Sequence, residues 1–119
     1  MMIAMIFEFT ASDEHFDEYM DEAAALRPLL SGIQGFISVE RFESKTTPGK
    51  FVSIGFFEDE NALREWRNLP EHRRAQQLGR TRLFKNYRLR IASVIRDYTM
   101  SDREHAPEDS KLAHDSRED

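Results

Sequence analysis

The segment from residue 35 to residue 76 constrains the fold more than any other part of this sequence. Two stretches rich in β-branched and aromatic residues, 35–44 and 50–57, flank a turn that contains Pro48 and Gly49. Pro fixes φ and Gly permits a positive φ, so the pattern is typical of a β-hairpin. Acidic residues then open a helix, because negative charge is stabilising at a helix N-terminus. The segment therefore predicts a ββα unit.

A strand and a helix are expected before this unit, over residues 2–10 and 14–30. The helix has an apolar face at helical spacing, made of Phe16, Met20, Ala23, Leu26 and Leu30. Pro70 is expected to divide the later helix in two, and a last strand is expected over 87–98. The order βαββαβ predicts an α+β, ferredoxin-like fold with one antiparallel four-stranded sheet.

Length and composition narrow the class of protein. The chain has 119 residues, which fits one domain, expected here over residues 1–100. Residues 101–119 carry seven acids and three bases and few large apolar groups, so we expect a disordered acidic tail. The absence of cysteine excludes disulfides, thiolate catalysis and Cys-ligated metals. No signal peptide and no apolar run near the roughly 20 residues of a membrane span is found, so a cytoplasmic protein is expected.

The expected strands are apolar on both faces. Ile3, Met5, Phe7 and Phe9 alternate with Met2, Ala4 and Ile6, and residues 50–57 behave alike. In the strand over 35–44, alternation places Phe36 and Phe42 on one face and Ile37 and Val39 on the other. Two helices cover only one face of such a sheet, and an exposed apolar face normally marks an interface. We therefore expect a homodimer that packs sheet against sheet and buries about 1,600 Å² or more. The alternative is a monomer whose second face is screened by small residues and the tail.

Charge is uneven along the chain. Residues 64–90 carry nine Arg or Lys against two Glu. Such a stretch suits phosphate or nucleic acid, but no nucleic-acid motif accompanies it, so a solvated basic surface is the preferred interpretation. There is no phosphate-binding Gly-rich motif and no metal-ligand spacing. If Arg41 points inward it needs a carboxylate, and Glu8 is the candidate partner.

The βαββαβ order, the strand GFISVERF, the strand GKFVSI and the W-x5-H helix resemble the antibiotic biosynthesis monooxygenase (ABM) family. The resemblance covers about residues 1–100 and implies a dimeric α+β barrel. Members of the family include cofactor-independent oxygenases that oxidise polycyclic phenols to quinones, haem-degrading monooxygenases, and proteins without an assigned reaction. The resemblance thus implies a monooxygenase that oxidises a small aromatic or quinol-like substrate with O₂, without a tightly bound cofactor or metal.

The family places its pocket between the helices and the sheet, and Trp66 and His72 match the pocket-lining Trp and His of several members. The resemblance therefore implies that His72 acts as a base or proton shuttle. Trp66 would donate its indole N–H to a substrate oxygen or shield the site. The alternative is that Trp66 fills the core and His72 lies on the surface. Four further residues are candidates for the substrate-binding wall or for the core: Phe7, Phe9, Phe36 and Phe56.

Two other functions remain open. In a haem-binding or haem-degrading variant, His72 would ligate iron and Trp66 would pack against the porphyrin. The haem degraders of the family carry an Asn in the first strand, where this chain reads Met-Ile-Phe-Glu-Phe, which speaks against that function. The third is a dimeric module that binds a small ligand without catalysis. No nucleic-acid partner and no membrane contact are expected.

Overall fold

The computed structural model describes residues 1–115. The strands are β1 (Ile3–Ala11), β2 (Phe36–Glu43), β3 (Lys50–Phe57) and β4 (Phe84–Ser93). The α-helices are α1 (Phe16–Ser31), α2 (Glu60–Asn68), α3 (Pro70–Leu78) and α4 (Glu108–His114). A short 3₁₀ turn precedes α1 at Asp13–His15, and a π-helical turn, η2, joins α3 to β4 at Gly79–Leu83.

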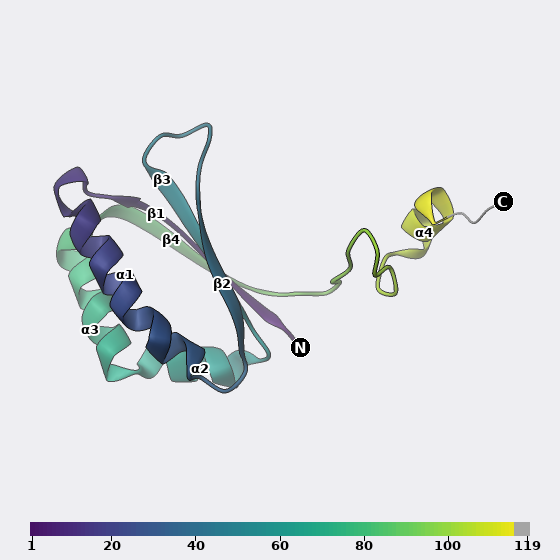
Figure 1. Ribbon diagram of the computed structural model, residues 1–119, viewed down its shortest axis with the longest axis horizontal. Helices are drawn as coiled ribbons and strands as arrows, with labels where there is room; N and C mark the ends of the chain where they lie inside the picture. Colours follow the sequence, from purple (N-terminus) through teal and green to yellow (C-terminus); the bar gives the residue numbers. More distant parts are fainter. Residues whose placement is uncertain (116–119) are drawn as a thin grey trace.

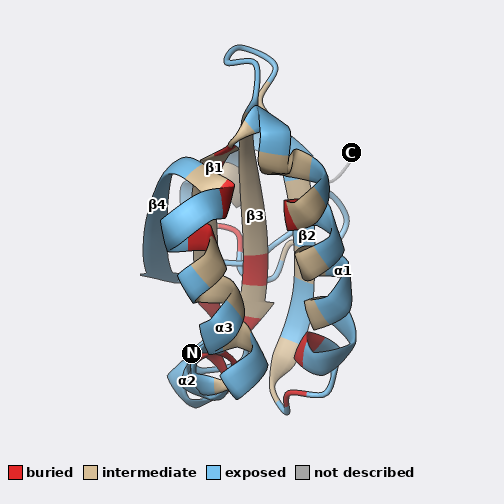
Figure 2. Ribbon diagram, turned by 90° about the vertical axis from the view of Figure 1, so that its left-hand side faces the viewer, coloured by how far each residue is buried: buried red, intermediate tan, exposed pale blue. Residues whose placement is uncertain are grey.

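The four strands form one antiparallel sheet in the order β2-β3-β1-β4. This order confirms the predicted ferredoxin-like α+β fold. Helices α1, α2 and α3 lie on one face of the sheet (Figure 1). Figure 2 shows α1 and α3 over the sheet, with buried segments on the strands and on the helices. We call this side of the sheet the helix face and the opposite side the outer face.

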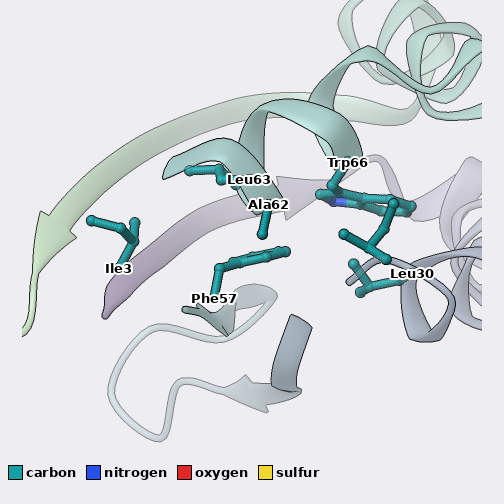
Figure 3. Packing of buried hydrophobic residues seen from close by; sticks show 7 residues of the cluster. Ile3, Leu30, Phe57, Ala62, Leu63 and Trp66 are labelled. Atoms are coloured by element: carbon teal, nitrogen blue, oxygen red, sulfur yellow. The ribbon is translucent and has the colours of Figure 1, made fainter. Parts of the chain in front are cut away.

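The core lies between the helices and the helix face, in two clusters. The first cluster surrounds Phe57, which is 0% exposed, and is shown in Figure 3. It contains Ile3, Leu30, Ile33, Phe57, Ala62, Leu63 and Trp66. The second contains Phe9, Tyr19 and Leu83. Helix α2 contributes Ala62, Leu63 and Trp66 to the first cluster, and its start is capped by the Asp59 carboxylate, which accepts the Ala62 N–H at 2.9 Å.

The last strand begins earlier and ends earlier than the expected 87–98. The chain leaves α3 through η2, so that β4 starts at Phe84 and ends at Ser93. Gly79 makes this turn compact: a Cβ at this position would lie 2.6 Å from the Phe84 ring. The close approach lets Phe84 turn under the helices, where it packs edge-to-face on Phe7.

Strand β2 differs from the expected alternation. A register irregularity between Phe36 and Ser38 shifts the faces of the strand at its start. As a result Phe36 lies on the helix face, against Phe57 at 5.8 Å between ring centroids. Val39 shares that face, whereas Phe42 lies on the outer face and is 44% exposed. The expected pairing of Phe36 with Phe42 on one face is therefore corrected.

The outer face combines apolar residues with one ionic cluster. Ala4, Ile6, Val52, Ile54 and Phe56 form its apolar part across β1 and β3. Beside them, the Glu8 carboxylate contacts Lys50 at 3.3 Å and Arg90 at 2.6 Å. The Lys50 hydrogen bond, followed by the nearby positive charges, holds the pKa of Glu8 below its ordinary value. Glu8 is thus not the partner of Arg41, which points to the helix face.

The homodimer through the outer face stays a prediction, and Ile54→Asp tests it. Ile54 sits opposite Ile6 near the middle of this face. The wild type is expected to sediment as a dimer at micromolar concentration. The Ile54→Asp variant is expected to sediment as a monomer, because a buried unpaired charge is costly. Leu112→Asp, at a 78% exposed position of α4, is the control that should leave the dimer intact. A monomeric wild type would show that the prediction is wrong.

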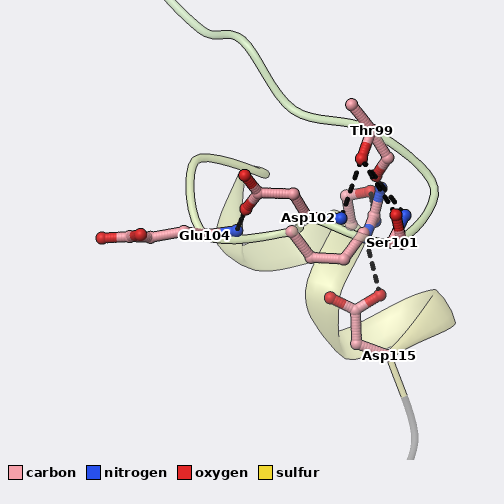
Figure 4. A network of polar contacts seen from close by, with 7 residues as sticks. Thr99, Ser101, Asp102, Glu104 and Asp115 are labelled. Atoms are coloured by element: carbon pink, nitrogen blue, oxygen red, sulfur yellow. Dashed lines mark hydrogen bonds and ion pairs between the residues drawn. The ribbon is translucent and has the colours of Figure 1, made fainter.

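The C-terminal segment runs away from the sheet and ends in α4 (Figure 1). Its loop is held by local polar contacts, shown in Figure 4. Thr99 Oγ1 accepts the Asp102 N–H at 2.8 Å, and Arg103 donates to Asp115 at 2.9 Å. Acids begin α4 and Lys111 and His114 end it, which suits the helix dipole. The described part of the expected tail is thus structured locally, and residues 116–119 lie outside the described residues.

Candidate active site

A cavity of about 470 Å³ lies between the three helices and the helix face of the sheet. Its floor is mainly apolar and comes from β1, β2 and β4, with Met5, Phe7, Val39, Leu89 and Ile91. Its walls come from the helices and η2, with Leu26, Leu30, Leu63 and Leu83 among them. Tyr87, Leu89 and Ile91 are 38%, 50% and 45% exposed, so the cavity opens along β4. This volume suits a small organic ligand.

Two rings stack on one wall of this cavity. The centroids of Trp66 and His72 are 3.9 Å apart and their planes differ by 21°. The break between α2 and α3 creates the pair: Leu69, as the residue before Pro70, is extended at φ −59° and ψ 133°. The chain then re-enters a helix and brings His72 Nδ1 to 3.0 Å from the backbone carbonyl oxygen of Trp66.

This contact determines which nitrogen of His72 carries the proton. A carbonyl oxygen only accepts, so Nδ1 is the donor and Nε2 keeps its lone pair. The Gln76 amide nitrogen lies 3.3 Å from Nδ1, but it donates to the Arg67 carbonyl at 3.2 Å. Its oxygen accepts from Arg73 at 2.9 Å, which sets the amide orientation. His72 Nε2 is therefore available to accept a proton or to bind a ligand.

The pKa of His72 also favours the neutral imidazole. Burial lowers the pKa of His72, and the positive charge of Arg73 lowers it further. The hydrogen bond to the Trp66 carbonyl acts in the opposite direction but is outweighed by burial. The imidazole is consequently neutral near pH 7, which is the state required of a general base.

The lowered pKa predicts a stability profile. The pKa of His72 is lower in the folded chain than in the unfolded chain, so unfolding takes up protons as pH falls. The contribution to the free energy of unfolding is expected to be complete above about pH 6.5, the ordinary His pKa. It should decline as pH falls towards the lowered pKa. Urea unfolding between about pH 5 and pH 8 should show a smaller decline in His72→Gln than in the wild type, and equal slopes would contradict this.

Besides His72 Nε2, the indole N–H of Trp66 is a polar group without a hydrogen-bond partner among residues 1–115. Trp66 is 4% exposed, yet within residues 1–115 its indole N–H donates to no protein acceptor. A buried Trp normally finds a partner for this group. Because Trp66 lines the cavity, a ligand oxygen is the natural acceptor. Trp66 and His72 thus form one wall of the cavity, and His72 Nε2 is its proton acceptor.

Comparison with known proteins places this geometry in a family. The family model described as "Antibiotic biosynthesis monooxygenase" matches residues 2–78. The chain belongs to this family. It is similar to "Jasmonate monooxygenase ABM" of Pyricularia oryzae, with 40% identity over 93 residues, 78% of this chain. The match spans 43% of that relative, less than half of its length.

Solved structures share the ABM fold. Rv0793 from Mycobacterium tuberculosis has a TM-score of 0.72 at 18% identity, covering 83% of this chain and 100% of that one. SnoaB from Streptomyces nogalater, described as a cofactor-independent oxygenase, has a TM-score of 0.69 at 14% identity. That match covers 81% of this chain and 95% of SnoaB. At such identities these likenesses show the fold alone.

Three of the candidate residues in this ABM chain meet at the cavity: Trp66, His72 and Phe7. The other three lie elsewhere, in the core or on the outer face, which are the alternatives to the cavity wall. Phe9 is 2% exposed in the second core cluster, and Phe36 packs on Phe57. Phe56 is on the outer face because it pairs with Ala4. Alternation within a strand does not say which face the helices cover, and the irregularity in β2 adds a further shift.

Four other aromatic and polar residues of the cavity are not among the site residues predicted from the sequence, although the sequence analysis allows an inward Arg41. They are Tyr19, Arg41, Phe84 and Tyr87. Tyr19 is four residues before Ala23, so helical spacing alone would have found it. Among residues 1–115 there is no group of three His, Asp or Glu side chains suited to a metal ion. The same residues contain no helix long and apolar enough to cross a membrane.

Proposed function

We propose that this cavity is the active site of a monooxygenase that oxidises a small phenolic or quinol-like substrate with O₂, without a tightly bound cofactor. The observation that carries the proposal is the Trp66–His72 wall, where the buried Trp66 ring stacks on a His72 whose Nδ1 donates to a carbonyl and whose Nε2 is left unprotonated. An apolar floor next to this pair suits a flat aromatic ring, which would close the side that opens along β4 when it binds. Membership of a monooxygenase family supports the reaction class.

The reaction balances with O₂ as the only oxidant. His72 Nε2 takes the phenol proton, and the phenolate passes one electron to O₂. The two radicals combine, which forms a C–O bond, and the protonated His72 returns its proton to the peroxide anion, giving a hydroperoxide. Loss of the C–H proton and of hydroxide then breaks the O–O bond, leaving a quinone carbonyl and one water molecule. The substrate loses four electrons and O₂ gains four, so no external reductant enters. Trp66 donates to the oxygen on which negative charge develops.

Two comparisons support parts of this proposal. SnoaB shares the fold and is described as a cofactor-independent oxygenase, which supports a reaction without a bound cofactor. The relative from Pyricularia oryzae is named for jasmonate, so jasmonate belongs on the substrate panel beside phenols and quinols. Because this chain covers less than half of that relative, jasmonate is a compound to test for binding and turnover.

Haem binding is a second candidate because the residues present fit the group. His72 Nε2 has a free lone pair that would ligate the iron, and the cavity arginines Arg67 and Arg73 would meet the propionates. A bound haem would supply O₂ activation, while these residues would only hold and orient it. A Soret band that shifts when hemin is added and is lost in His72→Ala would favour this function.

Oxygen consumption by the purified protein tests the proposal. The protein is treated with a chelator, checked for the absence of haem absorbance, and mixed with a panel of phenols, hydroquinones and jasmonate in an oxygen electrode. We expect O₂ uptake with at least one phenol or quinol, at one O₂ per product. If uptake appears only after hemin is added, the second candidate replaces the first. If neither condition gives uptake, the family member is a binding module.

A further inference from the structure

The side chains around the cavity are strongly unbalanced in charge. Its lining includes five arginines: Arg27, Arg41, Arg67, Arg73 and Arg80. It includes only two acidic residues, Glu22 and Glu40. Glu22 is already paired with Arg74 at 3.1 Å, and Glu40 is exposed. Within residues 1–115 none of the five arginines forms an ion pair with a carboxylate, so the cavity presents an uncompensated positive field.

Arg41 is the member of this set that faces the apolar interior. It lies on the helix face of β2 opposite Ser53, and it is half-buried, whereas the other four arginines are exposed. Its Nε donates to the Tyr19 hydroxyl at 3.0 Å, and its guanidinium carbon lies 5.3 Å from the centre of the Tyr19 ring. A partly buried charge without a counter-ion is costly, so an anionic group is the expected occupant beside it.

The Arg41 guanidinium is also held in one orientation, which leaves the N–H groups of its two terminal nitrogens free to donate. Tyr19 is 8% exposed and packs on Phe9 at 4.8 Å and on Phe84 at 5.4 Å, so the hydroxyl that orients Arg41 is rigid. Arg carries five N–H donors, and in the described residues only Nε of Arg41 has a protein acceptor. The two terminal nitrogens form a fork that matches a carboxylate in a bidentate manner.

We infer that the ligand of this cavity carries a carboxylate, which Arg41 binds while the apolar part of the ligand lies over Phe7 and Met5. The inference rests on the proposed function only in taking the cavity as the ligand site. It specifies the substrate class as a small amphipathic acid. Tyr19 acts as the positioning residue, because it holds Arg41 without touching the ligand's acidic group.

The single Trp of the chain gives a local readout of occupancy. Trp66 lies on the cavity wall, so its fluorescence responds to a ligand in this cavity. The probes are 4-phenylbutanoate and the isosteric, uncharged 4-phenylbutanamide, titrated without O₂ so that no turnover interferes. The wild type is expected to bind the carboxylate about 10- to 100-fold more tightly than the amide, since a charge-assisted hydrogen bond is worth this much.

Variants distinguish a direct contact of Arg41 with the carboxylate from the overall positive charge around the cavity. Arg41→Met should abolish the preference for the carboxylate and leave the affinity for the amide within about threefold. Arg64→Met removes the same charge from the exposed side of α2 and should keep the preference. Tyr19→Phe should weaken the carboxylate affinity several-fold while sparing the amide. Should Arg41→Met fail to fold, Arg41→Lys keeps the charge but loses the fork and should retain only part of the preference.

The outcomes distinguish this inference from the proposed function. An equal affinity of the wild type for both probes overturns the inference, as does an unchanged preference in Arg41→Met or a preference fully retained in Arg41→Lys. None of these binding results decides whether the protein consumes O₂. Conversely, a carboxylate preference that depends on Arg41 in a protein that consumes no O₂ supports the anchor and overturns the oxygenase.

Discussion

Replacing His72 by glutamine is expected to lower the rate of O₂-dependent oxidation roughly 100- to 10,000-fold, the usual contribution of a general base. Glutamine can still donate to the Trp66 carbonyl, which His72 Nδ1 contacts at 3.0 Å, so the local backbone is preserved. What it lacks is a group that titrates near neutrality. The measurement is initial O₂ uptake with the substrate that the panel identifies, at saturating concentration.

His15→Gln is the matched control for this variant. His15 lies before α1 and contacts Glu14 and Glu18 on the surface, outside the cavity. Its replacement should leave the oxidation rate unchanged. Binding of the substrate, followed by Trp66 fluorescence, should be within a few-fold of the wild type in both variants. An oxidation rate that survives His72→Gln would remove His72 from the reaction and leave it as a residue that packs on Trp66.

Replacing Phe57 by alanine is expected to lower the free energy of unfolding by about 3–5 kcal/mol, the cost of removing a large buried aromatic side chain. Phe57 is 0% exposed and sits at the centre of the first core cluster (Figure 3). It touches the Phe36 ring, and it lies beneath α2. Because total stability of a small domain is about 5–15 kcal/mol, this loss is a large part of it.

Urea or thermal unfolding measures the effect. Leu112→Ala, at a 78% exposed position of α4, should change the free energy of unfolding by less than about 0.5 kcal/mol. Phe57→Leu keeps most of the buried volume and should cost clearly less than Phe57→Ala. Equal, small losses in the free energy of unfolding for Phe57→Ala and Leu112→Ala would show that Phe57 does not lie at the centre of the core.

Most of the fold could be predicted because its signals are local. The turn at Pro48 and Gly49 and the β-rich runs beside it placed β3 at Lys50–Phe57 as observed. The expected division of the later helix at Pro70 is confirmed by α2 and α3. The apolar face of α1 was predicted correctly except near its start, where Met20 was expected on the buried side. Met20 is 37% exposed, and Tyr19 is the residue that turns inward.

The errors arose where tertiary structure overrides a local pattern. The π-helical turn after Gly79 has no simple periodicity, so the start of β4 and the inward position of Phe84 were missed. The irregularity in β2 moved Phe36 to the helix face, which no alternation rule anticipates. Glu8 meets Lys50 and Arg90 on the outer face because sheet order, and not sequence distance, brings them together.

The Trp66–His72 half of the candidate site could be predicted because its signal in the sequence is local. Trp66 and His72 lie on consecutive helices, and the Pro70 break joins their rings, so a local motif carries the pair. Arg41 and Tyr19 come from β2 and α1, and their contact depends on how α1 packs on the sheet. A contact between residues 22 positions apart on different elements leaves no mark in spacing.

Oxidation under oxygen-18 gas tests whether this cavity oxidises an aromatic substrate directly with O₂. The protein, free of haem and metal, is mixed with its best phenol or quinol, and the quinone is analysed by mass spectrometry. One oxygen-18 atom is expected in each quinone formed and one in water, and His72→Gln is expected to form labelled quinone roughly 100- to 10,000-fold more slowly. Quinone that carries oxygen from the solvent, or that forms equally well in His72→Gln, would contradict this expectation.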